Sequence, residues 1–544
     1  MEQAMISQTT PAVRMQNLAS ANLPHLKMRG LMPETGMIAN LFFSELQRPA
    51  CGTVSDLIKR TAAAAADDRQ KDLISGLLTA GKKFTSYEEL KDHAGYQGLI
   101  WAFRSMEKKD FHCHISAGLD ESEIAEIVVN SSKEQRKKMA ASLTGNEPDF
   151  ISTYPGIDAG FISSGAMSYA IMQRQPRDIA FLLSLYRPFH LWRAKDFFVT
   201  DKESLQQTVF RAALNLLADG ATAFDLRMNP YKPGLLDASE RAACGNIAGI
   251  TEQITEAAVK GLDQAINTAR SDLGIFAAPS DIRLLFSMNR GKFYGSTHIS
   301  AITEEIFRSI DRLKQRFPER IAGLDISGAE FSLEEHDPNA IWAKSVSLAN
   351  NAGLMTTTHI GDLSSMSGIL ADHYRQAQNG DAAMFETLAE EYLDFIGAFI
   401  RMGSGLDCIG HAFMLAPAFL SQCWREFNND GHDLPDLGSF DRIKSKVYEL
   451  TEYIKGLKMV IEHCPSVTVS SEVPNDPFKD NLIAGYKRSP IFNWTKANMN
   501  VKLGTDGIWY AGTKPRTLSE ELARLVLSEP DEITVGKMLS LVRK

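Results

Sequence analysis

The chain has 544 residues, of which 44% are hydrophobic and 23% are charged, as in an ordinary globular protein. This length exceeds one typical hydrophobic core and predicts one large domain with additions, or two domains. The net charge of −9 argues against a broad basic surface, so we expect neither a membrane nor a long nucleic acid as a partner. A small anionic ligand bound by a local basic cluster is compatible with this charge.

The cysteines are widely spaced, and no two form a C-x-x-C pair. They are Cys51, Cys113, Cys244, Cys408, Cys423 and Cys464. The first residues lack the basic-then-apolar order of a secretory signal, and no apolar run approaches the roughly 18 residues needed to span a bilayer. We therefore expect a soluble, cytoplasmic protein with reduced thiols.

Residues 1–105 are expected to form a helical N-terminal extension, followed by a barrel domain over residues 106–544. The segment 55–66 ends in five alanines and is favourable helix material. Ser86, with Glu89 three positions later, has the pattern of a capping box. Such an extension either packs against the barrel or acts as a lid or an oligomerisation element, so a homo-oligomer is one of the assemblies left open.

From about residue 106, short apolar runs alternate with helical segments, which is the pattern of β/α units. Eight runs are found, and they end at His114, Met228, Ser287, Ser327, His359, His411, Cys464 and Asp506. Eight such units predict an α/β fold that closes into a (β/α)8 TIM barrel. The alternative is a doubly wound open sheet, but no G-x-G-x-x-G follows an early strand. Residues 121–180 are expected to be an insertion after the first strand, because one crossover needs far fewer residues.

The predicted strand ends carry the residues that could perform chemistry. His112 and His114 are two positions apart, so a strand would point both imidazoles to the same side. Two converging imidazoles make half of a zinc site. His359, His411 and Asp506 stand at later strand ends, where a barrel of this kind gathers its functional groups. Together these positions predict a metal site.

Short motifs recur at these strand ends in a fixed order. They are F-H-C-H (111–114), F-D-L-R-M-N-P (224–230), L-D-I-S-G-A-E (324–330), T-H-I-G-D (358–362), C-I-G-H (408–411), E-H-C-P-S (462–466) and G-T-D-G (504–507). The ordered set resembles the adenosine/AMP deaminase family of metal-dependent amidohydrolases over roughly residues 107–540. The resemblance implies a zinc-dependent hydrolytic deaminase that acts on an adenine nucleoside or nucleotide and releases ammonia.

The resemblance also implies roles for individual residues. One Zn2+ per chain would be bound by the metal ligands His112, His114, His359 and Asp506. His411 would orient the attacking water and stabilise charge, and Asp362 would protonate the ring nitrogen so that the amine can leave. Gly328 corresponds to a backbone contact with the purine edge, where a side chain would obstruct approach.

Three departures from the family pattern bear on the substrate. Asp362 replaces a glutamate and is about 1.5 Å shorter in reach, which costs rate unless the backbone moves closer. Gly507 replaces an aspartate that contacts the purine in the family. Ser116 stands where nucleoside-specific members carry an aspartate, and a hydroxyl does not repel a 5′-phosphate, so the nucleotide is slightly favoured. Arg227 is a candidate contact for that phosphate.

Two other functions remain open at this point. The first is hydrolysis of a non-adenine amidine or amide at the same metal. The second is a weakly catalytic relative that binds a nucleotide, which the changes at Asp362 and Gly507 make credible.

Overall fold

The computed structural model describes residues 33–48, 52–80, 84, 87–115, 118–144, 164–185, 197–289, 299–327, 338–361, 382–402, 405–415, 441–466, 482–487, 489–507 and 517–543. Within these ranges, no helix has the length and apolar character needed to cross a bilayer.

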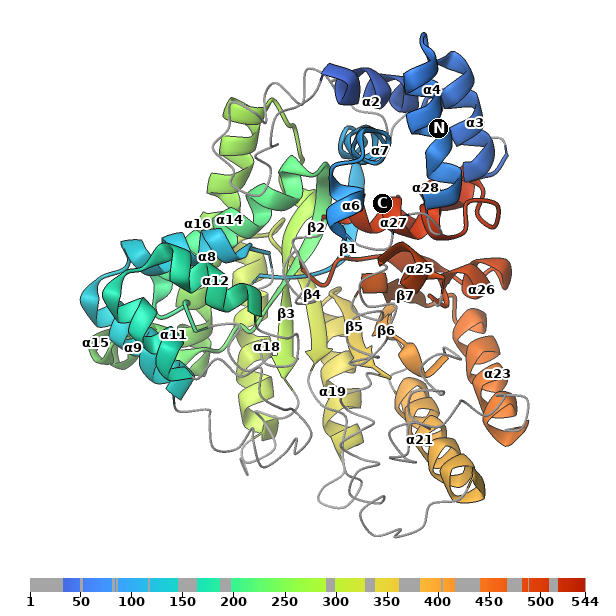
Figure 1. Ribbon diagram of the computed structural model, residues 1–544. Coiled ribbons are helices and arrows are strands. Elements are labelled where there is room, and N and C mark those ends of the chain that lie inside the picture. Colours follow the sequence, from blue (N-terminus) through green and yellow to red (C-terminus); the bar gives the residue numbers. More distant parts are fainter. Residues whose placement is uncertain are drawn as a thin grey trace.

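Eight parallel strands, each hydrogen-bonded to the next in sequence order, form the centre of the molecule (Figure 1). They are β1 (Lys108–His114), β2 (Ala221–Met228), β3 (Ile282–Asn289), β4 (Ile321–Ser327), β5 (Met355–Ile360), β6 (Cys408–His411), β7 (Val460–His463) and β8 (Val501–Leu503). Just past the end of β8, an isolated parallel bridge between Cys113 and Asp506 joins the last strand segment to the first. The predicted (β/α)8 TIM barrel is therefore confirmed.

The strands are apolar on both faces because they lie between the barrel interior and an outer layer of helices. Every residue of β4 is buried, and so are all residues of β2 except Thr222. Such continuous burial is typical of parallel strands, and it is why they occur in the sequence as unbroken apolar runs. Gly323 in β4 has no room for a side chain, since a Cβ there would lie 1.9 Å from the carbonyl oxygen of Met355 in β5.

Helices between the strands cover the outside of the barrel (Figure 1). The longer ones are α14 (Lys202–Ala218), α16 (Ile247–Leu273), α18 (Ile299–Arg316), α19 (Pro338–Asn351), α21 (Ala382–Met402) and α23 (Asp441–Gly456). Shorter ones are α15 (Ala238–Cys244), α25 (Leu482–Tyr486) and α26 (Ile491–Lys496), and the chain ends with α27 (Leu518–Ser528) and α28 (Val535–Val542). Local sequence sets their limits: Asp201 caps the start of α14 by accepting from the Ser204 N–H at 2.8 Å, and Gly274 ends α16 in the left-handed region.

A group of helices precedes β1 and packs beside the C-terminal helices (Figure 1). Its members are α2 (Pro33–Leu46), α3 (Val54–Ala64), α4 (Asp68–Ser75), η3 (Gly76–Thr79), α6 (Tyr87–Lys91) and α7 (Ala94–Arg104). Backbone hydrogen bonds join α3 to the segment before α28, from Val54 N–H to Ile533 O at 3.0 Å and from Ser55 N–H to Pro530 O at 2.9 Å. We propose that this part of the 1–105 extension serves to pack against the barrel, because its buried surface faces the C-terminal helices.

Within the predicted insertion 121–180, the structure describes helices α8 (Glu121–Asn130), α9 (Lys133–Thr144) and α11 (Ser164–Gln173), together with the first half of α12 (Pro176–Leu185). In Figure 1 they form a layer of their own beside α14 and α16. Asn215 of α14 anchors this layer, since its side-chain amide donates to Gly118 O at 3.0 Å and to Glu123 Oε2 at 2.8 Å. That residues 121–180 act as one inserted unit remains a proposal.

The buried Glu123 predicts a pH dependence of stability. Burial, with the nearby charge of Asp120, raises the pKa of this carboxyl from its ordinary 4.5 to about 8. The folded state therefore holds the proton more tightly than the unfolded state, and this stabilisation is complete below about pH 4.5 and lost as the pH rises through about 8. We expect the free energy of unfolding to fall by about 2 kcal/mol more in the wild type than in Glu123→Gln over this range. Urea unfolding at several pH values measures this, and parallel curves for the two proteins would contradict it.

Candidate metal centre

Five side chains converge at the carboxyl ends of the strands. His112 and His114 project from β1, His359 from β5 and His411 from the end of β6, while Asp506 follows β8. All five are buried, with exposed fractions between 0% and 5%. The barrel therefore brings together residues that are almost 400 positions apart in the chain, at the end where the sequence pattern placed them.

The potential ligand atoms of these residues lie close together. Nε2 of His359 is 3.1 Å from Nε2 of His112 and 3.2 Å from Nε2 of His114. Oδ1 of Asp506 is 3.3 Å from Nε2 of His114 and 3.5 Å from Nε2 of His112. Ligand atoms around a tetrahedral metal with bonds of about 2.1 Å are about 3.4 Å apart. These four residues therefore have the spacing of a tetrahedral site.

His411 belongs to the same cluster. A ligand atom from each of His112, His359, His411 and Asp506 lies within 4.8 Å of the others. Burial and the neighbouring His112 lower the pKa of His411 well below its ordinary value, so that its imidazole is neutral at neutral pH. A neutral imidazole can accept a proton or bind a metal.

The carboxylate of Asp506 fits a bound cation. Its side chain is fully buried, yet neither oxygen accepts a hydrogen bond of normal geometry from the described residues. Burial alone would raise the pKa of Asp506, but His112, His411 and His359 lower it to about 2, so the group is charged at neutral pH. A buried charge of this kind is costly unless it is paired or binds a metal.

Backbone strain is concentrated at the same place. His411 and Asp506 have φ angles of 67° and 60°, in the left-handed region that non-glycine residues rarely adopt. Such conformations cost about 1–3 kcal/mol each and cluster at functional sites. At Asp506 the backbone is fixed by a hydrogen bond from its N–H to His112 O at 2.7 Å. The neighbouring Thr505 is fixed by Asp110, whose carboxylate accepts from the Thr505 hydroxyl at 2.7 Å and its N–H at 3.2 Å.

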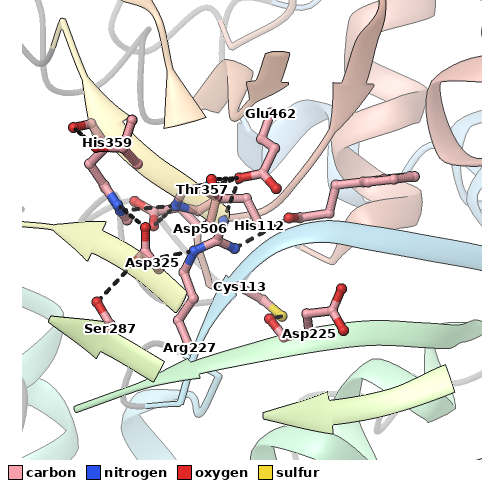
Figure 2. A network of polar contacts seen from close by, with 12 residues as sticks. His112, Cys113, Asp225, Arg227, Ser287, Asp325, Thr357, His359, Glu462 and Asp506 are labelled. Carbon is pink, nitrogen blue, oxygen red and sulfur yellow. Dashed lines mark hydrogen bonds and ion pairs between the residues drawn. The ribbon is translucent and has the colours of Figure 1, made fainter. Parts of the chain in front are cut away.

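Two carboxylates orient the histidines (Figure 2). Oδ1 of Asp325 in β4 lies 3.0 Å from Nδ1 of His359, and Oε2 of Glu462 in β7 lies 3.1 Å from Nδ1 of His112. A carboxylate at Nδ1 favours the tautomer with its proton there, which leaves the lone pair on Nε2, the atom that faces the cluster. The sequence interpretation did not assign this role to Asp325 or Glu462. The available signal was an acidic residue within an otherwise apolar strand.

The other predicted site residues differ in outcome. Ser116, Gly328 and Asp362 lie outside the described residues. Arg227 lies on β2 beneath the histidines and is 1% exposed. Its guanidinium contacts Glu462 and Asp325, and Nη1 donates to the Phe111 carbonyl at 3.2 Å. This position favours an internal role for Arg227 over the predicted contact with substrate.

The two cysteines nearest the site have no features of a nucleophile. Burial raises the pKa of both Cys113 and Cys464 well above the ordinary value, so both thiols are protonated at neutral pH. Cys113 donates weakly to Asp225 O at 3.8 Å.

No family model and no curated protein sequence matches this chain. Several solved structures of adenosine/AMP deaminase-like proteins are similar to it. The N6-mAMP deaminase MAPDA of Arabidopsis is 15% identical over 81% of this chain and 92% of its own, with a TM-score of 0.45. Arabidopsis ADAL complexed with GMP is 13% identical over 81% and 91%, with a TM-score of 0.45. The adenine deaminase of Arthrobacter aurescens is 13% identical over 80% and 91%, with a TM-score of 0.36. At these identities the function has to be inferred from the site.

Proposed function

We propose that this chain is a zinc-dependent hydrolytic deaminase that acts on an adenine nucleoside or nucleotide, with the nucleotide slightly favoured, and that releases ammonia. The observation that carries the proposal is the convergence of three imidazoles and one carboxylate, with four of their ligand-atom distances between 3.1 and 3.5 Å. The ordered motifs at the strand ends supply the reaction class and the substrate class.

The donor set supports zinc. Three neutral imidazole nitrogens and one carboxylate oxygen suit Zn2+, whereas Mg2+ and Ca2+ prefer oxygen ligands. His112, His114, His359 and Asp506 would hold one Zn2+ per chain. When bound, the metal would supply a water activated as a nucleophile near neutral pH.

The protein's own groups would handle protons and orientation. The His411 ring centroid lies 4.7 Å from that of His112 and 5.1 Å from that of His359, so His411 borders the ligand cluster. As a neutral imidazole it can accept a hydrogen bond from the attacking water and then stabilise the charge that develops. From the motif resemblance, Asp362 would protonate the ring nitrogen, Gly328 would contact the base edge, and Ser116 would leave room for a phosphate.

Metal analysis combined with an absorbance screen of adenosine, deoxyadenosine, AMP, dAMP and ATP tests the proposal. We expect one zinc per chain and turnover of a phosphorylated substrate in preference to adenosine. Stoichiometric zinc without turnover of any adenine compound would contradict the proposal. That result would favour the amide hydrolase or the nucleotide-binding relative.

Asp362→Asn tests the assigned proton donor. Because an amide cannot supply the proton, we expect kcat to fall by about 100- to 10,000-fold while the zinc content stays unchanged. The matched control is Asp441→Asn at the exposed start of α23, which should leave both values unchanged. Unchanged kcat in Asp362→Asn would remove this residue from its assigned role.

A further inference from the structure

Arg227 joins the two carboxylates that orient the metal-site histidines (Figure 2). Its Nη2 donates to Oε2 of Glu462, the same oxygen that lies 3.1 Å from Nδ1 of His112. Its Nε lies 3.5 Å from Oδ2 of Asp325, whose other oxygen lies 3.0 Å from Nδ1 of His359. One guanidinium thus reaches two histidines of the cluster, each through one carboxylate.

The contacts of Arg227 also span the barrel interior. The residue comes from β2, and its partners Glu462 and Asp325 come from β7 and β4. Its Nη1 donates to the carbonyl oxygen of Phe111, the residue that precedes His112 in β1. Two further hydroxyls support the same carboxylates: Ser287 donates to Asp325 at 2.9 Å and Thr357 donates to Glu462 at 3.3 Å. The side chain and both carboxylates are no more than 1% exposed, so water does not substitute for these contacts.

We propose that Arg227 is a positioning residue for the metal centre: by holding Glu462 and Asp325 together, it fixes the rings of His112 and His359 with both Nε2 atoms directed at the metal. This inference rests on the proposed function for the identity of the metal ligands. It replaces the expectation that Arg227 contacts a substrate phosphate.

The chemistry of arginine suits this role. A planar guanidinium offers five N–H donors in a fixed fork, so it can contact two carboxylates and a carbonyl at once. A lysine ammonium keeps the charge but cannot span the same three acceptors from one position. Removing the residue would leave two adjacent buried carboxylates without their common cation, so that they repel each other and turn away from the histidines.

Zinc affinity of purified, metal-free protein tests the proposal, measured by competition with a chromophoric chelator. We expect Arg227→Met to weaken zinc binding by about 10- to 100-fold, as for other loss of support behind metal ligands. Arg227→Lys should recover part of this loss. The visible spectrum of the Co(II)-substituted protein should also change in Arg227→Met, because it reports the coordination geometry directly.

Arg104 provides a matched control. It is also a buried arginine paired with a buried carboxylate, since its Nε donates to Asp219 at 3.0 Å, but it lies between α7 and α27 rather than under the metal site. Arg104→Met should lower the melting temperature of the metal-free protein and leave zinc affinity and the Co(II) spectrum unchanged.

Several outcomes would overturn the proposal. One is wild-type zinc affinity and an unchanged Co(II) spectrum in Arg227→Met. If that variant does not fold, wild-type affinity and spectrum in Arg227→Lys would have the same meaning. An equal loss of affinity in Arg104→Met would show that general destabilisation is the cause. A wild-type protein that binds no zinc would instead contradict the proposed function itself.

Discussion

Replacement of His359 by alanine is expected to remove the metal and with it the deaminase activity. Nε2 of His359 lies 3.1 and 3.2 Å from the Nε2 atoms of His112 and His114, so its loss opens one side of the ligand set. A four-ligand zinc site is worth about 10–16 kcal/mol, and one ligand in four corresponds to a loss of affinity of about 100-fold or more. Zinc content after dialysis, measured by elemental analysis, should fall well below one per chain.

His463→Ala is the matched control for this experiment. His463 is also a fully buried histidine of a barrel strand, but its Nε2 lies 2.8 Å from the Ser489 hydroxyl and not in the ligand cluster. This variant should lose some stability and keep its zinc. Full zinc content in His359→Ala would rule out the proposed ligand set.

Gly504→Ala is expected to have the largest effect on stability among single-methyl changes near the site. A Cβ at residue 504 would lie 2.5 Å from Cβ and 2.7 Å from the backbone nitrogen of His112. The backbone has little freedom to move away, because the Asp506 N–H is bonded to His112 O at 2.7 Å. Overpacking of this kind costs about 3 kcal/mol. Urea unfolding measures the loss, and zinc competition should show weaker binding because His112 is displaced.

Gly536→Ala provides the comparison. Gly536 lies in α28, and a Cβ there would meet no heavy atom within 4 Å. In a helix, alanine is favoured over glycine by about 1 kcal/mol, so this variant should be at least as stable as the wild type. A similar free energy of unfolding for both glycine variants would mean that the space around residue 504 is not as restricted as described.

The fold could be predicted because each barrel strand is buried on both faces and therefore appears as a separate apolar run. The five converging residues could be predicted because strand ends of a parallel barrel meet at one rim. The end of β8 was less accurate. The run was expected to reach Asp506, but the regular strand ends at Leu503, and Asp506 turns into the left-handed region.

The supporting contacts could not be predicted in the same way. In a strand buried on both faces, apolar character does not distinguish inward from outward positions, so Arg227 could equally have faced a ligand. Asp225, two positions earlier, pairs with Lys109 and Arg283 instead. Which acidic residue meets which histidine depends on the register between strands, and that register shifts between β1 and β2. Register of this kind follows from tertiary packing rather than from local sequence.

The seam between β1 and β8 has a consequence for how the protein is made. Asp110 and Thr505 bond across 395 positions of chain, and Asp506 enters the ligand cluster at the same seam. A ribosome has therefore released almost the entire polypeptide before the fourth ligand can meet the other three. Contacts between such distant positions form late, because a long loop must close first. Tight zinc binding would thus mark a finished molecule, and a nascent chain that ends before β8 would carry all four histidines of the cluster without the site.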